Sequence, residues 1–195
     1  MAIFPFPYFS FRYKQLFQTQ IRPIEASFYG TMGNALSITA AIAVPLLGGT
    51  VIGIGMRNDV KGWYQTIKKP TWTPPNWLFG PVWSLLYTMI GVASWRVYAA
   101  GGGALPLGLY ATQLLLNFAW SPLFFKAHRL DLAAYDITAL AGMIVATIVA
   151  FNKVDPMAAA LMVPYLGWSS FATALTWNIY TNNPDQRKVC VYLLP

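Results

Sequence analysis

Five long stretches of the chain contain no Asp, Glu, Lys or Arg, and their apolar residues do not alternate with polar ones as in a half-buried strand. A helix needs about 20 predominantly apolar residues to cross the hydrocarbon core of a bilayer. Four stretches exceed this length, and the 16 residues of 137–152 reach it when extended back through Asp136 toward Leu132. The uncharged stretches are residues 26–56, 70–95, 97–125, 137–152 and 156–184. We therefore predict an all-α integral membrane protein, a bundle of five transmembrane helices near residues 37–56, 77–98, 105–125, 132–151 and 157–180.

This pattern divides the chain into three parts. Residues 1–36 hold three basic residues and one acid, and they lack the compact apolar core of a signal peptide. We expect a disordered or interfacial N-terminal extension there, with organelle targeting as the alternative. Residues 37–182 form the predicted membrane domain, and residues 183–195 form a C-terminal tail.

The composition agrees with a membrane location and excludes several kinds of site. Charged residues make up 10% of the chain, against about 25% in soluble domains, and hydrophobic residues make up 56%. Cys190 and His128 are the only residues of their types, so neither a disulfide within the chain nor a Cys or His metal site is expected. The net charge of +7 comes from basic residues near helix ends, which suits membrane insertion better than nucleic-acid binding.

The distribution of Lys and Arg predicts an orientation. The first loop, the third loop and the C-terminal tail together carry eight of them, and the remaining connections and the N-terminal part carry five. Cytosolic segments are enriched in these residues, so the first loop and the C-terminus are predicted to face the cytosol. Gly49 and Gly53 in the first helix form a pair of small residues four apart, which favours close helix packing within the chain, or else in a homodimer.

The first connection, residues 57–75, combines rigid aromatic and proline residues, and residues 68–83 read KKPTWTPPNWLFGPVW. Prolines restrict the backbone and lower the entropy of the free loop. We therefore predict a preformed aromatic lid over the helix bundle, anchored by Lys68 and Lys69 at the cytosolic face. The alternative is an interfacial belt of tryptophans whose lysines meet lipid phosphates.

The segment GWYQTIKKPTWTPPNWLFGPVWSLLY resembles the signature of the translocator protein family, also called tryptophan-rich sensory proteins (TspO/MBR) or peripheral benzodiazepine receptors. Three further segments match in order: PLGLYATQLLLNFAWSPLFF, AAYDITAL and VDPMAAALMVPYLGWSSFATALTWNIY. The resemblance covers about residues 40–182. It implies a five-helix bundle with a pocket toward the first loop that binds tetrapyrroles, such as protoporphyrin IX or haem, for transport, scavenging or stress signalling. No cofactor is required by this reading.

The resemblance and the helical spacing together name nine candidate ligand-binding residues. Asn117 and Trp120, three residues apart, share one helix face, and Asn117 is predicted either to bond across helices, with Gln113 one turn earlier, or to contact the ligand. Ala172 leaves space at the pocket wall. The candidates are Trp72, Pro74, Trp77, Asn117, Trp120, Phe124, Trp168, Ala172 and Trp177.

Two alternative functions stay open at this stage. Some bacterial members break down protoporphyrin in light with two tryptophans, whose positions fall on Trp72 and Trp177, so a light-dependent enzyme is one alternative. A sterol- or lipid-binding transporter is the other, although the cholesterol motif of animal members is incomplete here, with Trp177 in place of its Tyr and Tyr180 seven residues before Arg187.

Two further expectations concern location and one buried acid. The resemblance and the N-terminal extension suggest a multi-pass protein of the mitochondrial outer membrane, or of another organelle membrane of a eukaryote. Asp136 is expected to play a structural part near the start of its helix, paired with Arg129 or Lys126.

Overall fold

The computed structural model describes residues 22–185, with side chains described from residue 33 onward. The chain divides into two compact units, one up to Thr39 and one from Ala40 onward. Helix α2 (Arg22–Gly55) runs through both. Residues 22–36 of the predicted N-terminal extension are therefore helical, and residues 1–21 lie outside the described part.

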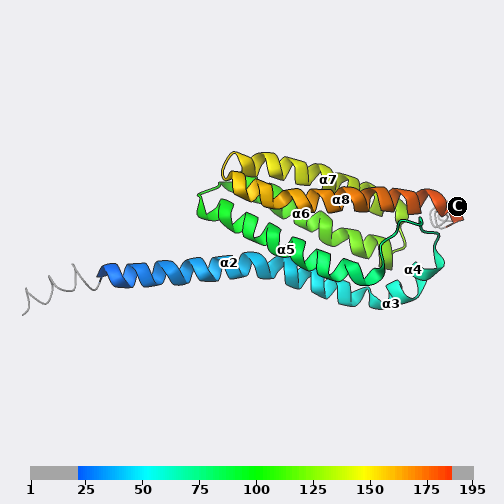
Figure 1. Cartoon of the computed structure of the whole chain (residues 1–195), viewed down its shortest axis with the longest axis horizontal. Coiled ribbons are helices and arrows are strands. Elements are labelled where there is room, and N and C mark those ends of the chain that lie inside the picture. The colour runs from blue at the N-terminus through cyan, green and yellow to red at the C-terminus, as the bar shows by residue number, and fades with distance from the viewer. Residues whose placement is uncertain (1–21, 186–195) are drawn as a thin grey trace, which may run out of the picture. The chain divides into compact units, whose positions relative to one another are not determined.

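Long helices make up most of the second unit (Figure 1). Helix α6 continues without a break into one turn of π-helix, η2. The limits of α5, of α6 with η2, and of α7 and α8 all lie within two residues of the predicted ones. These elements are α5 (Asn76–Ala99), α6 (Ala104–Ser121), η2 (Pro122–Lys126), α7 (Leu130–Asn152) and α8 (Pro156–Asn182).

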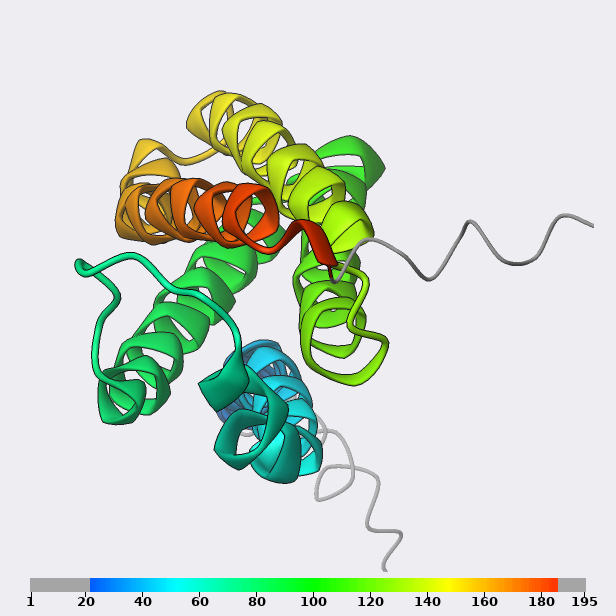
Figure 2. The same cartoon turned by 90° about the vertical axis from the view of Figure 1, so that its right-hand side faces the viewer.

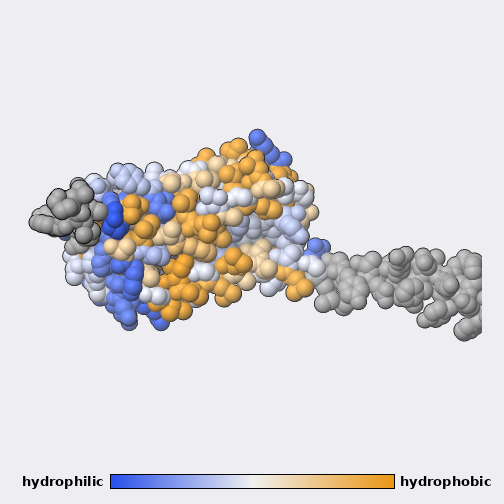
Figure 3. Space-filling model, turned by 180° about the vertical axis from the view of Figure 1, so that it is seen from behind, coloured by the Kyte–Doolittle hydropathy of each residue, from blue (hydrophilic) through white to orange (hydrophobic). Residues whose placement is uncertain are grey.

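Four helices of the described part are long and apolar enough to cross a membrane: residues 33–55 of α2, together with α5, α7 and α8. Apolar side chains form a band over the helices of the second unit, with hydrophilic ones toward its ends, on the face shown in Figure 3. The all-helical membrane class is thus confirmed. Helix α6 is not among the four because Gln113 and Asn117 reduce its apolar character, so the number five stays a prediction.

Glycines bring α2 close to its neighbours within the second unit. A Cβ at Gly91 of α5 would lie 2.7 Å from the carbonyl oxygen of Ala41 and 2.8 Å from Cα of Ile42, so the two backbones touch there. A Cβ at Gly49 would lie 2.1 Å from the ring of Tyr87. Gly49 therefore serves packing within the chain, whereas Gly53 has nothing within 4 Å of such a Cβ.

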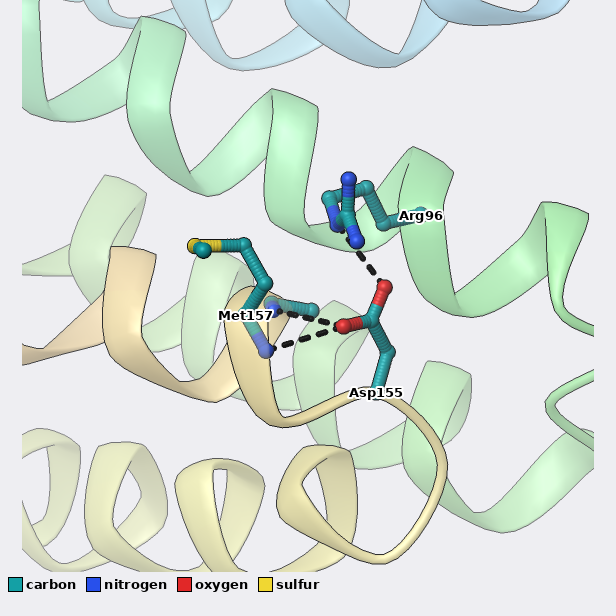
Figure 4. A network of polar contacts seen from close by, with 4 residues as sticks. Arg96, Asp155 and Met157 are labelled. Carbon is teal, nitrogen blue, oxygen red and sulfur yellow. Dashed lines mark hydrogen bonds and ion pairs between the residues drawn. The ribbon is translucent and has the colours of Figure 1, made fainter.

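The connection between α7 and α8 is fixed by Asp155, which serves two functions at once (Figure 4). One carboxylate oxygen accepts hydrogen bonds from the backbone N–H groups of Met157 and Ala158, at 2.9 and 3.3 Å, and so caps α8. The other lies 2.7 Å from Nε of Arg96 at the end of α5. The hydrogen bond with Arg96 lowers the pKa of Asp155, so the pair joins α5 to α8 at this end of the bundle.

This double role predicts a graded, pH-dependent loss of stability. Asp155→Asn keeps an acceptor for the cap but removes the charge facing Arg96, and Asp155→Ala removes both. We expect the melting temperature in detergent to fall in the order wild type, Asn, Ala at pH 7, measured by circular dichroism. Because the folded-state pKa lies below the unfolded value of about 3.9, the advantage of wild type over Asn is present above that value and is lost as the pH falls through the folded pKa. Asn152→Ala, at the exposed end of α7, is the control, and an Asp155→Ala variant as stable as wild type would contradict the assignment.

Candidate ligand-binding cavity

A cavity of about 920 Å³ lies inside the second unit. Its volume is within the range of roughly 300 to 1,000 Å³ found for small-molecule sites. Residues of α2, α3 (Arg57–Lys61), α5, α6, η2, α7 and α8 contribute to its walls. Aromatic rings dominate the lining: Tyr64, Trp77, Phe79, Trp83, Tyr87, Phe118, Trp120, Phe124, Phe125 and Trp168.

The structure brings most of the predicted site residues together at this cavity. Those that line it come from the start of α5, from α6 with η2, and from the middle of α8. They are Trp77, Asn117, Trp120, Phe124, Trp168 and Ala172. Trp72, Pro74 and Trp177 are not part of the lining.

Trp72 lies on the outer side of a short series of aromatic contacts. Its side chain is 47% exposed, and its ring packs edge-on against Phe171 with centroids 5.5 Å apart. Phe171 in turn lies 5.5 Å from the ring of Trp168, which lines the cavity. Trp72 therefore reaches the site only through two intervening rings.

Trp177 is held on the seam between α7 and α8. Its indole N–H donates a hydrogen bond to Oγ1 of Thr138 at 2.9 Å, and the ring of Tyr135 packs edge-on against it with centroids 5.6 Å apart. Both partners belong to α7. These contacts occupy Trp177 outside the cavity lining.

The π-helical turn places one aromatic stack at the wall. The N–H of Ala127 bonds to the carbonyl of Pro122 at 2.9 Å, five residues back, which widens the helix locally. Phe124 is 1% exposed, and its ring stacks on Trp120 with centroids 4.9 Å apart. The indole nitrogens of Trp120 and Trp168 are buried and have no hydrogen-bond partner among the described residues. Buried polar atoms are nearly always paired, so these two donors need a further explanation.

Asn117 bonds across helices, as one of its two predicted roles requires, and it also lies at the cavity wall. Its Oδ1 accepts a hydrogen bond from the hydroxyl of Tyr87 on α5 at 2.6 Å, and the same side chain lines the cavity. One turn earlier, Oε1 of Gln113 accepts a hydrogen bond from the hydroxyl of Tyr165 on α8 at 2.8 Å. Helix α6 is thus joined by its amides to the helices on either side.

The only charged side chains in the lining are basic. Arg57 and Lys61 are four residues apart on α3 and share one face of that short helix. Asp59, on the same helix, is not part of the lining, and its carboxylate lies 3.7 Å from Nζ of Lys126. Among the described residues neither Arg57 nor Lys61 forms an ion pair. The cavity therefore carries positive charge at its loop end.

The first loop crosses the end of the bundle between α2 and α5, and passes the end of α8 (Figure 2). It contains α3 and a second short helix, α4 (Trp63–Thr66). Tyr64 and Ile67 are each 5% exposed and pack in one apolar cluster with Phe124 and Ile179. Aromatic and aliphatic burial therefore attaches this loop to the bundle.

Two more contacts hold the helical part of the loop. Trp63 stacks on His128, whose φ of 53° is unusual for a residue other than glycine, with centroids 4.1 Å apart. Nζ of Lys69 donates a hydrogen bond to the carbonyl of Tyr64 and lies 4.5 Å above its ring. Lys69 therefore bonds within the loop. Burial lowers the pKa of Lys69 and raises the pKa of Tyr64.

The partners considered for Asp136 bind other acids. Arg129 forms two hydrogen bonds with Asp131, at 2.9 and 2.7 Å, and Lys126 faces Asp59. Oδ2 of Asp136 is buried, and no residue of the described part forms a hydrogen bond with it. The pairing proposed from the sequence was wrong because Asp131 is closer to Arg129 along the chain.

Several lining residues were not predicted, although their helical spacing in the sequence pointed to a shared face. Trp83 and Tyr87 are four residues apart on α5, the spacing of one helix face, and both line the cavity. Arg57 and Lys61 have the same spacing. Residues of α2 between Leu46 and Ile54 contribute to the wall as well. Apart from the pair Gly49 and Gly53, that apolar helix carries no residue pattern that distinguishes its cavity side.

Comparison with known proteins agrees with this arrangement. The model of the TspO/MBR family matches residues 41–181, which include nearly all of the helical bundle. The chain belongs to the TspO/MBR family. It is 40% identical to the translocator protein of Sus scrofa over 149 residues, which are 74% of this chain and 88% of the relative. It is 42% identical to the translocator protein of Homo sapiens over 142 residues, 70% of this chain and 81% of the relative.

TspO/MBR proteins also occur outside animals. The tryptophan-rich protein TspO of Archaeoglobus fulgidus is 39% identical over 152 residues, 77% of this chain and 99% of the relative. An archaeon has no mitochondria. Membership of the TspO/MBR family therefore establishes a membrane protein with this helical domain, and does not by itself assign it to one membrane.

Proposed function

We propose that this protein binds a tetrapyrrole, such as protoporphyrin IX or haem, in the cavity beneath its first loop, for transport, scavenging or stress signalling. The observation that carries the proposal is the cavity itself. Flat aromatic faces line a space of about 920 Å³, and polar groups are few there. A planar apolar macrocycle needs such faces for stacking and a small number of polar groups for orientation.

The basic end of the cavity suits the acidic groups of these ligands. Protoporphyrin IX and haem carry two propionate groups at one edge of the macrocycle. With the macrocycle among the rings of α5, α6 and α8, the propionates would lie toward Arg57 and Lys61, which face no acid of the described chain. Cation–carboxylate hydrogen bonds at this edge would fix the orientation of the ligand.

Filling the cavity should weaken binding without unfolding the protein. Ala172 lines the cavity and is 9% exposed, so Ala172→Leu places extra methyl groups in the space for the ligand. We expect the dissociation constant for protoporphyrin IX to rise by about 5- to 150-fold, because overpacking a filled site costs about 1–3 kcal/mol. Quenching of tryptophan fluorescence in detergent, in the dark, measures binding.

Ala174→Leu is the matched control, two residues along the same helix at an exposed position outside the lining. It should bind as wild type does. Equal binding by wild type and Ala172→Leu would place the ligand elsewhere, and no saturable quenching in any of the three would remove the tetrapyrrole proposal.

The charge of the ligand provides an independent prediction. Protoporphyrin IX should bind more tightly than its dimethyl ester, which has the same macrocycle and no carboxylate. Arg57→Gln and Lys61→Gln should each weaken binding of the acid by about two- to fivefold, as expected for exposed ion pairs, and leave binding of the ester unchanged. Lys153→Gln, at the connection of α7 to α8, removes the same charge and is the control. Equal loss of affinity for acid and ester would show that the two cations do not contact the propionates.

The two alternative functions have less support. Light-driven breakdown would use Trp72 and Trp177, and neither contributes to the cavity lining. A neutral sterol would leave Arg57 and Lys61 without an anion. We therefore propose ligand binding rather than catalysis, with acidic tetrapyrroles preferred to sterols.

We further propose that α6 with η2 is the fifth membrane span and that the first loop faces the cytosol. The 18 residues of α6 continue directly into the 5 of η2, so that together they are long enough to cross the bilayer. The surplus of Lys and Arg in the first and third loops supports the orientation.

In a eukaryotic cell we expect the protein in the mitochondrial outer membrane or another organelle membrane, because the chain carries a basic, acid-poor N-terminal part. Imaging of a fluorescent fusion against organelle markers checks this expectation. A signal confined to the plasma membrane would contradict it. Deletion of residues 2–21 tests whether the N-terminal part directs the location, since it lies outside the cavity-forming unit.

A further inference from the structure

One side chain at the end of α8 makes a paired contact with the backbone of the first loop. Oδ1 of Asn183 accepts a hydrogen bond from the N–H of Lys68 at 2.9 Å, and Nδ2 of Asn183 donates one to the carbonyl of Lys68, also at 2.9 Å. The two residues are 115 positions apart in the sequence. The amide thus pairs with both polar groups of one loop residue, as a neighbouring strand would.

The same amide is also fixed to its own helix. Nδ2 donates a second hydrogen bond to the carbonyl of Ile179, one turn back, at 2.7 Å. Asn183 is 8% exposed, so water competes little for these bonds. Three bonds on a buried amide leave it one orientation, and that orientation fixes the position of Lys68 relative to α8.

The loop segment held in this way lies next to the cavity. Ile67, directly before Lys68, packs in the cluster that contains Phe124 and Ile179, and both of these line the cavity. Tyr64, four residues before Lys68, lines it too. The segment from Tyr64 to Lys68 therefore begins at a residue of the cavity lining and ends at the residue that Asn183 holds.

No other described contact replaces this one at residues 67–69. The stack of Trp63 on His128 and the pair of Asp59 with Lys126 hold α3 and α4. The bond from Lys69 stays within the loop, because its acceptor is the carbonyl of Tyr64. Further along, Thr73 bonds to Pro70 within the loop, and the ring of Trp72 packs against Phe171 of α8. Apart from apolar burial of Ile67, Asn183 is the connection of this segment to the bundle.

We propose that Asn183 is a positioning residue that keeps the first loop closed over the cavity and thereby limits the rates at which a ligand enters and leaves. The proposal rests on the function proposed above for the cavity. It assigns Asn183 no contact with the ligand, since Asn183 is not part of the lining. Its loss should change both rates more than it changes affinity.

The experiment compares Asn183→Leu with a neighbouring control. Leu has nearly the same size and shape but neither donates nor accepts hydrogen bonds. Asn182→Leu changes the exposed residue beside it, whose Nδ2 bonds only to Asn178 within α8. Stopped-flow quenching of tryptophan fluorescence by protoporphyrin IX gives association and dissociation rates in detergent. We expect both rates to rise by about tenfold in Asn183→Leu, the factor that one to two net hydrogen bonds supply, with the dissociation constant changing by less than about threefold.

Hydrogen exchange tests the loop directly and needs no ligand. In wild type the amide of Lys68 is bonded to Asn183, so it should exchange slowly. In Asn183→Leu its exchange should become faster, together with that of the next few loop residues, while the amides of α5 to α8 keep their protection. A purely structural role for Asn183 would instead loosen the end of α8 and leave the loop unchanged.

A second variant guards against a failure of Asn183→Leu to fold. Asn183→Asp keeps an acceptor for the N–H of Lys68 and loses both donated bonds, so at pH 7 it should show the same changes to a smaller extent. Rates and exchange equal to those of Asn182→Leu in both variants would overturn the proposal. If protoporphyrin IX does not bind even to wild type, the proposed function fails, and unchanged Lys68 exchange would still overturn the closure separately.

Discussion

Two hydrogen bonds between a tyrosine and an amide side chain, Tyr87 with Asn117 and Tyr165 with Gln113, determine how α6 sits in the bundle. The hydrocarbon core offers no water to a buried amide, so each amide needs a partner from another helix. The partners come from α5 and α8, which fixes the rotation of α6 about its axis. That rotation turns Trp120, three residues after Asn117, toward the cavity. The polar residues that make α6 less apolar than the four candidate membrane spans are therefore the ones that orient this wall of the cavity.

The membrane explains why the helices could be predicted so closely from the sequence. A charged residue is costly in hydrocarbon, so stretches without charge have to match the bilayer thickness, and their ends mark the helix ends. The regular spacing of side chains along a helix likewise predicted which residues of one helix share a face. Helical spacing and the family resemblance together grouped Asn117, Trp120 and Phe124, and the structure places all three in the cavity lining. On α8 the same argument grouped Trp168, Ala172 and Trp177, of which Trp168 and Ala172 line the cavity and Trp177 does not.

The remaining contacts depend on which residue of another segment is within reach, and spacing says nothing about that. Trp72 and Trp177 resemble the lining tryptophans in type, yet Phe171 and Thr138 hold them elsewhere. Asp136 had two plausible cationic partners, and each faces a different acid. The attachment of the first loop was predicted through its lysines, whereas Tyr64 and Ile67 provide it by burial. A contact between residues 115 positions apart, such as that of Lys68 with Asn183, has no signal in a single sequence.

The first loop is held both by an ion pair and by hydrogen bonds between neutral groups, and these two kinds of contact depend differently on ionic strength and pH. The pair of Asp59 and Lys126 is ionic, 3.7 Å apart, with a lysine side chain that is 67% exposed, so dissolved salt weakens it. The amide of Asn183 is neutral and buried, and its attraction to the backbone of Lys68 does not change with ionic strength or with proton concentration across the physiological range. The attachment of the loop at Lys68 therefore does not depend on the salt concentration of the surrounding solution. A change in ionic strength would alter the ion pair that holds α3 and leave the hydrogen bonds of Lys68 with Asn183 unchanged.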